Sequence, residues 1–164
     1  VRVLASYKSL SDDFCVNVDQ HFAVEFLEEV IARHSYTVAA HNLQFTLNCD
    51  EDVSGFFDNS ILFIILDTCI YNSIKAGAQN IKLSATEGDQ YLYLFIEDNG
   101  PGFPEELLEG DFSQGSISVE SQSTGLGLFF ANKLIQSHQE GELTGSIQLS
   151  NNITGAKVTL AIPL

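Results

Sequence analysis

The stretch Glu97-Asp98-Asn99-Gly100-Pro101-Gly102-Phe103 decides the fold, because it places an acid and two spaced glycines directly after the alternating strand predicted for Tyr91 to Glu97. Two glycines separated by one residue allow a tight turn and a close backbone approach to a flat ligand. The ionised carboxylate of Asp98 can only accept hydrogen bonds, for example from an exocyclic amine. The same residues also suit a plain turn that ends a strand, so both interpretations stay open.

A long buried helix is predicted upstream of this stretch, from a cap at Asp58 or Asn59 to about Gly77. Its apolar run begins at Ile61 and is broken by Asp67 and Thr68, so it is far shorter than the ~20 residues that span a bilayer. A buried core helix is the expected structure.

One face of this helix carries Thr68, Asn72 and Lys75 within a narrow arc, at about 100° per residue. Earlier turns of the same face carry three isoleucines and are expected to be buried: Ile61, Ile64 and Ile65. A pocket over the last two turns would explain the change, with the Asn72 amide oxygen as a metal ligand and the Lys75 ammonium on a phosphate. The alternative is a buried helix whose end emerges into water.

A second glycine pair lies in Ser123-Thr124-Gly125-Leu126-Gly127-Leu128, where a polar segment leads into an apolar helix. Unpaired amides at a helix N-terminus bind phosphate, and glycine lets the phosphate approach closely. The segment lacks the third glycine of a dinucleotide-binding fingerprint and the Gly-Lys-Ser/Thr of a P-loop. Ordinary helix capping remains the alternative.

The remaining pattern predicts a single α+β domain, a two-layer sandwich in which a mixed, mostly antiparallel sheet packs on about three helices. Residues 1–12 read as the end of a helix that precedes the domain, and residues 13–164 as the domain itself. Strands are predicted at 14–18, 43–47, 80–85, 91–97, 146–149 and 157–162, and helices at 20–39, 58–77, 105–108 and 125–138. The segment 98–124 is predicted as a long loop, and loops of this length in compact domains are usually either functional or disordered.

The strongly acidic composition limits which molecules can be partners of this chain. The chain has 164 residues with 7 Lys+Arg against 22 Asp+Glu, a formal net charge of -15. This field disfavours nucleic acid and anionic membranes, so neither is expected as a direct partner. Three cysteines without a CxxC spacing favour a reducing cytoplasm. An anionic ligand would have to be held locally, by backbone amides, a metal ion and a few lysines.

Taken in order, the three motifs resemble those of the GHKL ATPase superfamily, and of bacterial sensor histidine kinases within it. Asn72 with Lys75 resembles the N box. Asp98, Gly100 and Gly102 resemble the G1 box, Phe112 the F box, and Gly125 with Gly127 the G2 box. The resemblance covers about Val16 to Leu164 and implies the Bergerat form of the two-layer sandwich.

The resemblance also implies roles for these residues. Asp98 would hold the adenine amino group of ATP, Asn72 would ligate Mg²⁺, and Lys75 would neutralise phosphate charge. The segments 100–103 and 125–128 would complete the nucleotide site, with Gly100, Gly102, Phe103, Gly125, Leu126, Gly127 and Leu128 as binding residues. A lid over 105–124 would cover the phosphates, and the γ-phosphoryl group would pass to a histidine, a reaction that needs mainly positioning and charge stabilisation.

Two departures bear on that activity. Thr68 stands one turn before Asn72, where ATP-hydrolysing and serine-kinase relatives place a glutamate base; a neutral imidazole acceptor needs no base, so Thr68 favours histidine. Histidine kinases often carry asparagine there as a second metal contact. The lid has no Lys or Arg. We therefore expect modest ATP affinity that depends strongly on Mg²⁺.

The phosphoacceptor is expected outside this chain. No histidine here has the acidic neighbour and Arg-x-Pro context of the family's acceptor box; His34 and His41 are expected on helix surfaces, and His138 as a cation at a helix C-terminus. The implied partners are an upstream dimerisation domain and a downstream response regulator, with a homodimeric parent and a monomeric fragment. A degenerate nucleotide-sensing domain and an ATPase or serine kinase are the alternatives.

Overall fold

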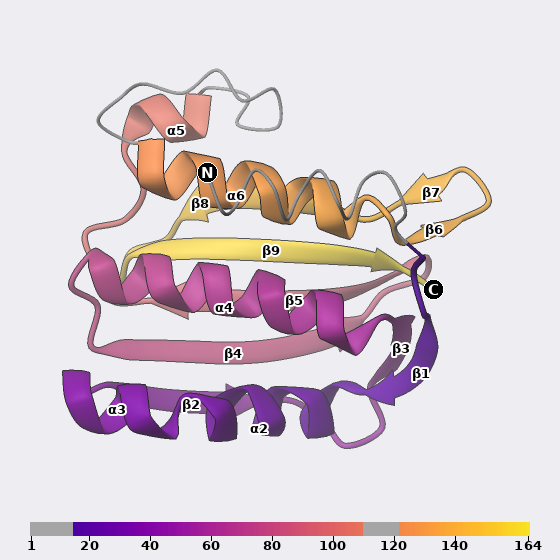
Figure 1. Cartoon of the computed structure of the whole chain (residues 1–164), viewed down its shortest axis with the longest axis horizontal. Helices are drawn as coiled ribbons and strands as arrows, with labels where there is room; N and C mark the ends of the chain where they lie inside the picture. The colour runs from indigo at the N-terminus through magenta and orange to yellow at the C-terminus, as the bar shows by residue number, and fades with distance from the viewer. Residues whose placement is uncertain (1–14, 110–121) are drawn as a thin grey trace.

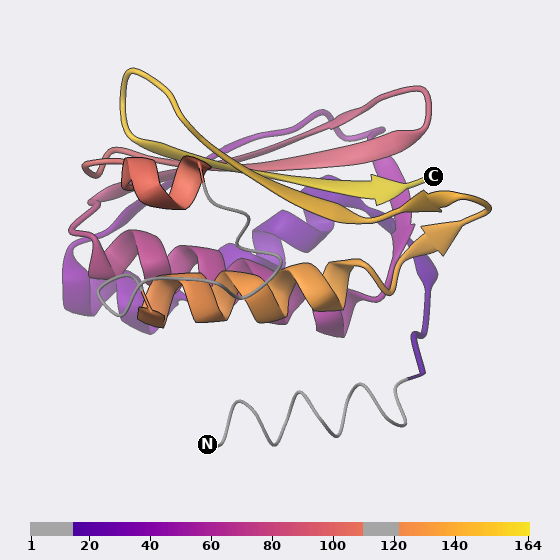
Figure 2. The same cartoon turned by 90° about the horizontal axis from the view of Figure 1, so that it is seen from above.

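Two layers make up the fold. The computed structural model describes residues 15–109 and 122–164. One layer is a five-stranded sheet, and the long helices pack side by side against a single face of it (Figure 2). This arrangement confirms the predicted α+β two-layer sandwich.

The main sheet contains β2 (Gln44–Asn48), β4 (Asn80–Glu87), β5 (Tyr91–Asp98), β8 (Ser146–Asn151) and β9 (Ala156–Pro163). The helices are α2 (Ala23–Arg33), α3 (Ser35–His41), α4 (Asn59–Lys75), α5 (Glu105–Glu109) and α6 (Gln122–Ile135). Two short strand pairs lie beside the sheet: β1 (Asp19–Phe22) with β3 (Ser54–Phe57), and β6 (Gln139–Glu140) with β7 (Leu143–Thr144).

Strand β5 lies at the centre of the order β2-β4-β5-β9-β8 (Figure 1). It pairs antiparallel with β4 and β9, while β2 pairs parallel with β4. A parallel pair needs a long crossover connection, and here β3 and α4 supply it. The register sets Asp98 opposite Ile81 and Glu97 opposite Lys157, so the end of β5 lies beside the start of β9.

Helix α4 is the central helix of the core. Its cap is Asp58, as predicted, whose Oδ1 accepts from the amides of Ser60 and Ile61 at 3.0 and 3.2 Å. Both sides of the helix are apolar, because it packs against the sheet and between α2 and α6. The expected burial of its Ile face is only partly right, since Ile64 is 47% exposed whereas Ile61 and Ile65 are buried.

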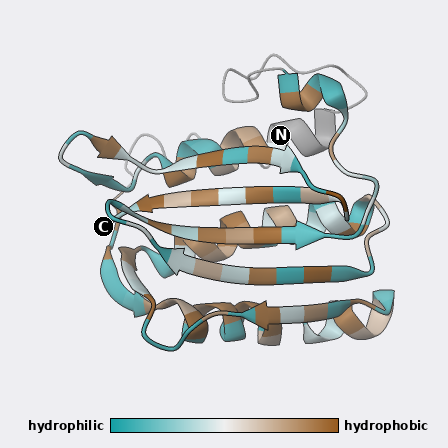
Figure 3. Cartoon of the chain, turned by 180° about the vertical axis from the view of Figure 1, so that it is seen from behind, coloured by the Kyte–Doolittle hydropathy of each residue, from teal (hydrophilic) through white to brown (hydrophobic). Residues whose placement is uncertain are grey.

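None of the described helices covers the far face of the sheet (Figure 3). On this face β5 carries a row of three aromatic residues. The ring centroids of Tyr91 and Tyr93 are 5.9 Å apart, and those of Tyr93 and Phe95 are 6.4 Å apart. The Lys157 ammonium lies 4.7 Å from the Phe95 ring centroid, a cation–π distance. Strand β5 thus alternates between buried core residues and a half-exposed aromatic row.

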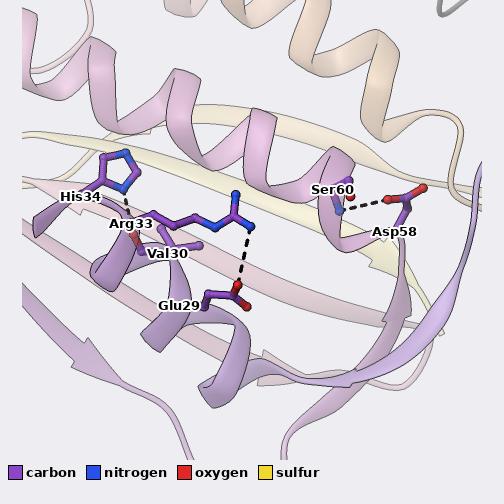
Figure 4. A network of polar contacts seen from close by, with 6 residues as sticks. All are labelled: Glu29, Val30, Arg33, His34, Asp58 and Ser60. Atoms are coloured by element: carbon purple, nitrogen blue, oxygen red, sulfur yellow. Dashed lines mark hydrogen bonds and ion pairs between the residues drawn. The ribbon is translucent and has the colours of Figure 1, made fainter.

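The predicted helix over 20–39 is wrong at both ends and in the middle. Residues 19–22 form β1 instead, and the rest divides into α2 and α3 at His34. The His34 Nδ1 donates to the Val30 carbonyl at 2.8 Å (Figure 4). Its Nε2 lies 3.2 Å from Asp67 Oδ1. With only 14% of its side chain exposed, His34 is not the surface residue expected, whereas His41 is exposed on α3.

His138 is another correction. It lies three residues beyond α6 with only 2% of its surface exposed, and its Nε2 accepts the Asp58 amide at 3.0 Å. Burial lowers the pKa of His138, an effect that the nearby carbonyls of Ile135 and Leu134 and the Asp58 carboxylate oppose. The ring is therefore a neutral acceptor that joins the end of α6 to the start of α4, not a helix-terminal cation.

Two further strand predictions need correction. The strand predicted at 14–18 appears later in the chain, as β1. Strands β3, β6 and β7 were not predicted, so neither the β1–β3 pair nor the β6–β7 pair was expected. Among the described helices, none is long and apolar enough to cross a bilayer. The domain boundary predicted at residue 12 lies outside the described residues.

Candidate functional site

A cavity of about 230 Å³ lies over the last two turns of α4 and beside the end of β5. Its walls come from four places: the end of α4, the end of β5, the loop after β5 and the start of β9. The lining residues are Cys69, Asn72, Ser73, Ala76, Ile96, Asp98, Pro101, Gly102, Phe103, Pro104, Ala156 and Val158. Most of them are apolar, as is typical of sites for flat organic ligands.

Asp98 is the anchored polar group of the cavity, with 7% of its surface exposed. Its Oδ1 accepts from the amides of Gly100 at 2.9 Å and Ala156 at 3.1 Å. Its Oδ2 accepts from the Ser73 hydroxyl at 2.6 Å. A carboxylate has about four acceptor positions, so these three donors fix its orientation and leave about one position, on Oδ2, for a ligand.

The loop after β5 is held by asparagines. The Asn151 side chain accepts from the Phe103 amide at 2.7 Å and donates to the Phe103 carbonyl at 3.0 Å. The Asn99 Oδ1 accepts from the amides of Gln79 and Asn80, both at 2.9 Å. Gly102 has a φ of +87°, a conformation that glycine adopts without strain, and it packs against Asn151.

Gly155 permits a close approach of two chain segments at this site. A Cβ on Gly155 would overlap the Asp98 carbonyl oxygen and lie 2.8 Å from the Gly100 carbonyl oxygen. The turn between β8 and β9 can therefore press against the loop that carries Asp98 only because residue 155 is glycine. The motif analysis missed Asn151, Gly155 and Ser73. Asn151, Asn152 and Gly155 between two predicted strands are a local signal of a hairpin, and that signal does not reveal the contact with the Asp98 loop.

Asn72 lines the cavity and has an unsatisfied side-chain donor. Its Nδ2 is buried, and none of the described residues offers it a hydrogen-bond partner. A buried donor without a partner costs about 1–3 kcal/mol. A bound ligand with an acceptor at this position would remove that cost.

The rest of the predicted α4 face is arranged differently from expectation. The Thr68 hydroxyl donates to the Ile64 carbonyl of its own helix at 2.9 Å, and neither Thr68 nor Lys75 lines the cavity. Lys75 lies exposed in the last turn of α4, with its Nζ 6.0 Å from the Tyr71 ring centroid. The structure thus brings Asn72 to Asp98 but does not bring Lys75 to them.

The second glycine pair lies inside α6, which contacts α4. This helix spans Gln122–Ile135 instead of the predicted 125–138, so Gly127 does not lie at its N-terminus as expected. A Cβ added to Gly127 would lie 3.2 Å from the Thr68 methyl carbon, so Gly127 allows the two helices to pack closely. Leu128 is completely buried and belongs to the core, which leaves no part of its side chain for a ligand. Gly125 and Leu126 lie in the first turns of α6, and Phe112 lies outside the described residues.

Residues 57–164 match the model of the family described as histidine kinase-, DNA gyrase B-, and HSP90-like ATPase. The chain belongs to this ATPase family. The match includes Asn72, Asp98 and both glycine pairs, and it implies ATP as the ligand of the domain.

A curated relative and two solved structures agree with this assignment. The signal transduction histidine-protein kinase AfsQ2 of Streptomyces coelicolor is 31% identical over 122 residues, which are 71% of this chain and 22% of AfsQ2. The Acinetobacter baumannii histidine kinase AdeS matches with a TM-score of 0.73 at 22% identity, over 99% of this chain and 75% of that chain. The histidine kinase ThkA, solved in complex with the response regulator protein TrrA, matches with a TM-score of 0.78 at 21% identity, over 99% of this chain and 46% of that chain.

The resemblance to histidine-kinase ATP-binding domains is therefore confirmed, as is the fold class. The chain spans less than a quarter of the length of AfsQ2. In this ATPase domain, the cavity residues suit a nucleotide, since Asp98 offers an acceptor to an amine and Asn72 offers an unsatisfied donor. Burial raises the pKa of the Cys69 thiol to about 12, so this wall of the cavity stays uncharged.

The site is sparing in metal ligands. No group of three His, Cys, Asp or Glu side chains suited to a metal ion occurs within residues 15–109 and 122–164. A Mg²⁺ ion that is held mainly by nucleotide phosphates needs only one or two protein ligands. The Asn72 amide oxygen fits that limited requirement.

Proposed function

We propose that this domain binds Mg-ATP in the cavity beside Asp98 and transfers the γ-phosphoryl group to a histidine of an upstream dimerisation domain, in two-component signal transduction. The observation that carries the proposal is the buried Asp98 carboxylate, which three donors hold in place with one acceptor position left at the cavity. A carboxylate that is held so firmly suits recognition of one amino group rather than general charge attraction.

In this proposal the adenine ring occupies the apolar part of the cavity. Ile96 and Val158 form buried walls on the two central strands, and the loop 100–103 lies against the other side. The amino group donates to Asp98. Gly100 and Gly102 keep the loop backbone close, while Phe103 is fixed by Asn151.

The triphosphate lies toward Asn72 and the N-terminal end of α6. The Asn72 amide oxygen ligates Mg²⁺, and its unsatisfied Nδ2 donates to a phosphate oxygen. The unpaired amides of the first turn of α6, which ends at Gly125, contact the phosphates, whereas the amides of Leu126, Gly127 and Leu128 bond within the helix. Lys75 reaches the phosphates only if its side chain swings away from Tyr71, so it contributes charge rather than fixed geometry.

The chemistry is phosphoryl transfer from ATP to an imidazole nitrogen. A nitrogen–phosphorus bond forms as the bond from the γ-phosphorus to its bridging oxygen breaks, and ADP leaves. Bound Mg²⁺ would offset the negative charge on the phosphates. This chain positions the nucleotide and contributes no base, since the Thr68 hydroxyl is bonded to its own helix.

The acceptor histidine comes from another domain. His34 lies beside Asp67, and His138 is buried against Asp58. His21 lies 4.8 Å from the Phe57 ring, and His41 is exposed but lacks an acidic neighbour. We place the acceptor in a dimerisation domain that ends in residues 1–12, with residues 13–164 as the ATP-binding domain.

The proposed partners are that dimerisation domain, in a homodimeric parent, and a response regulator that receives the phosphoryl group. The complex of the similar kinase ThkA with the response regulator TrrA supports the second partner. We propose a cytoplasmic location for the domain, because none of Cys15, Cys49 and Cys69 forms a disulfide. The isolated domain is proposed to be monomeric and to contact neither nucleic acid nor membrane directly.

A degenerate nucleotide-sensing domain is the second candidate. Two observations favour it: Lys75 lies outside the cavity, and the Thr68 hydroxyl is bonded to its own helix instead of facing the cavity. Such a domain would bind ATP weakly and transfer nothing. An ATPase or serine kinase is less favoured, because both activities use a general base and residue 68 is threonine instead of glutamate.

The test has two stages. Titration calorimetry with ATP should show modest affinity that falls at least about tenfold when EDTA replaces Mg²⁺, and Asn72→Ala should abolish that metal dependence. Asn48→Ala, on the open sheet face, is the matched control. Phosphoryl transfer from labelled ATP to an added dimerisation domain then separates the kinase from the degenerate domain. Binding that is tight without metal would contradict the role of Asn72.

A further inference from the structure

Ser73 is a polar residue of the cavity to which none of the motifs assigns a role. It follows Asn72 on α4, has 7% of its surface exposed, and lines the cavity beside Asp98. Its hydroxyl lies 2.6 Å from Asp98 Oδ2, a short distance that is typical of a hydroxyl donating to an ionised carboxylate. Serine and aspartate therefore form one buried polar pair.

Counting acceptor positions shows what this pair offers a ligand. The amides of Gly100 and Ala156 occupy both positions on Asp98 Oδ1. The carboxylate consequently cannot accept two hydrogen bonds from a ligand in the bidentate manner. Within this pair, the polar atoms that remain for a ligand are Asp98 Oδ2, with one open position, and the Ser73 hydroxyl oxygen, with two lone pairs.

We propose that Ser73 determines base specificity by donating its hydroxyl proton to the ring nitrogen beside the adenine amino group. This inference rests on the proposed function, since it names how the same cavity reads its nucleotide. The adenine amino group donates to Asp98 Oδ2, and the Ser73 hydroxyl turns from Asp98 to N1 of the ring. The carboxylate keeps three donors throughout, because the amino group replaces the hydroxyl that it loses.

The geometry suits this exchange. The two protein atoms lie 2.6 Å apart, side by side, as are an amino nitrogen and a ring nitrogen bonded to the same carbon. A hydroxyl rotates about a single bond at little cost, so it can point either to the carboxylate or to the base. A 6-keto purine presents an acceptor to Asp98 and a donor to Ser73, which leaves the buried carboxylate facing a carbonyl oxygen. The pair therefore excludes inosine and guanosine nucleotides that bind in the adenine orientation.

The test combines a change in the protein with a change in the ligand. Titration calorimetry compares ATP with 1-deaza-ATP, in which N1 is replaced by C–H, on wild type and on Ser73→Ala. Wild type should bind 1-deaza-ATP about 5- to 10-fold more weakly than ATP, as expected for one lost hydrogen bond. Ser73→Ala should bind both ligands with equal affinity. Ser84→Ala, on the open sheet face, should behave like wild type.

A second variant guards against a folding defect in Ser73→Ala. Ser73→Cys keeps a similar volume but has only a weak donor, so it should show a reduced preference for ATP. An unchanged ratio of the two affinities in both variants overturns the role of Ser73, as does tighter binding of GTP than of ATP by wild type. Failure of wild type to bind ATP at all would overturn the proposed function as well.

Discussion

Asp98→Asn separates recognition of the base from stability of the loop. The amide oxygen of asparagine can replace Oδ1 and keep the bonds from Gly100 and Ala156. The amide nitrogen then takes the place of Oδ2, where it can donate to the Ser73 hydroxyl oxygen after the hydroxyl proton turns away. At the cavity, however, the asparagine NH₂ group faces the amino group of the ligand, and two donors cannot form a hydrogen bond with each other.

The magnitudes follow from these contacts. Loss of a hydrogen bond to a charged acceptor costs about 1.5–3 kcal/mol, which corresponds to about 10- to 150-fold weaker ATP binding. Stability should change little, because all three partners of residue 98 stay paired. A net loss of about 1 kcal/mol lowers the melting temperature of a domain of this size by about 2–4 °C.

Calorimetric titration with Mg-ATP, paired with thermal unfolding of the same samples, measures both effects. Asp89→Asn is the matched control, since Asp89 lies exposed in the turn between β4 and β5. ATP binding by Asp98→Asn within about threefold of wild type would refute the reasoning, because the lost hydrogen bond is worth at least about tenfold. A fall in melting temperature far beyond the expected range would show that residue 98 holds the fold rather than the base.

Three other changes test the surroundings of the site. Gly155→Ala should destabilise the domain by about 1–3 kcal/mol in urea unfolding, because its Cβ overlaps the carbonyl oxygens of residues 98 and 100. Asn151→Ala removes both bonds to Phe103 and should speed exchange of the Phe103 amide hydrogen about tenfold by NMR; unchanged exchange would mean that the loop holds itself. Burial lowers the pKa of His138 in the folded state, so below about pH 6.5 the unfolded state binds more protons than the folded state. The free energy of unfolding should therefore be highest above that pH and should fall as the pH drops toward the lower pKa of the folded state. His138→Gln should flatten this decline in unfolding free energy, and an equally steep decline in the variant would assign it to other groups.

Local signals were enough to predict the elements that form the core. Asp58 before an apolar run predicts α4 and its cap, and strict alternation predicts β5 and β9. Their burial follows from those patterns without knowledge of the partners. The resemblance of the motifs to a known family also predicted that Asn72 and Asp98 belong to one site, and both line the same cavity.

Long-range pairing explains what the sequence could not indicate. Asp19–Phe22 reads as the start of a helix, yet it pairs with β3, which lies more than thirty residues away. His34, at the break between α2 and α3, contacts Asp67 of α4, and the Asn151 side chain reaches across 48 residues to Phe103. The direction of a side chain also depends on distant neighbours. Lys75 lies on the predicted face of α4, yet its side chain does not line the cavity.

The position of β9 has a consequence for the synthesis of this protein. Strand β9 is made after the other four strands of the sheet, yet it lies between β5 and β8, and its first amide, from Ala156, fixes Asp98 across 58 residues. A ribosome that has not released residues 155–163 therefore holds a chain with a three-stranded sheet and an unanchored carboxylate. Nucleotide binding must begin after translation of the domain is essentially complete, so ATP can stabilise the finished fold but cannot guide its early steps.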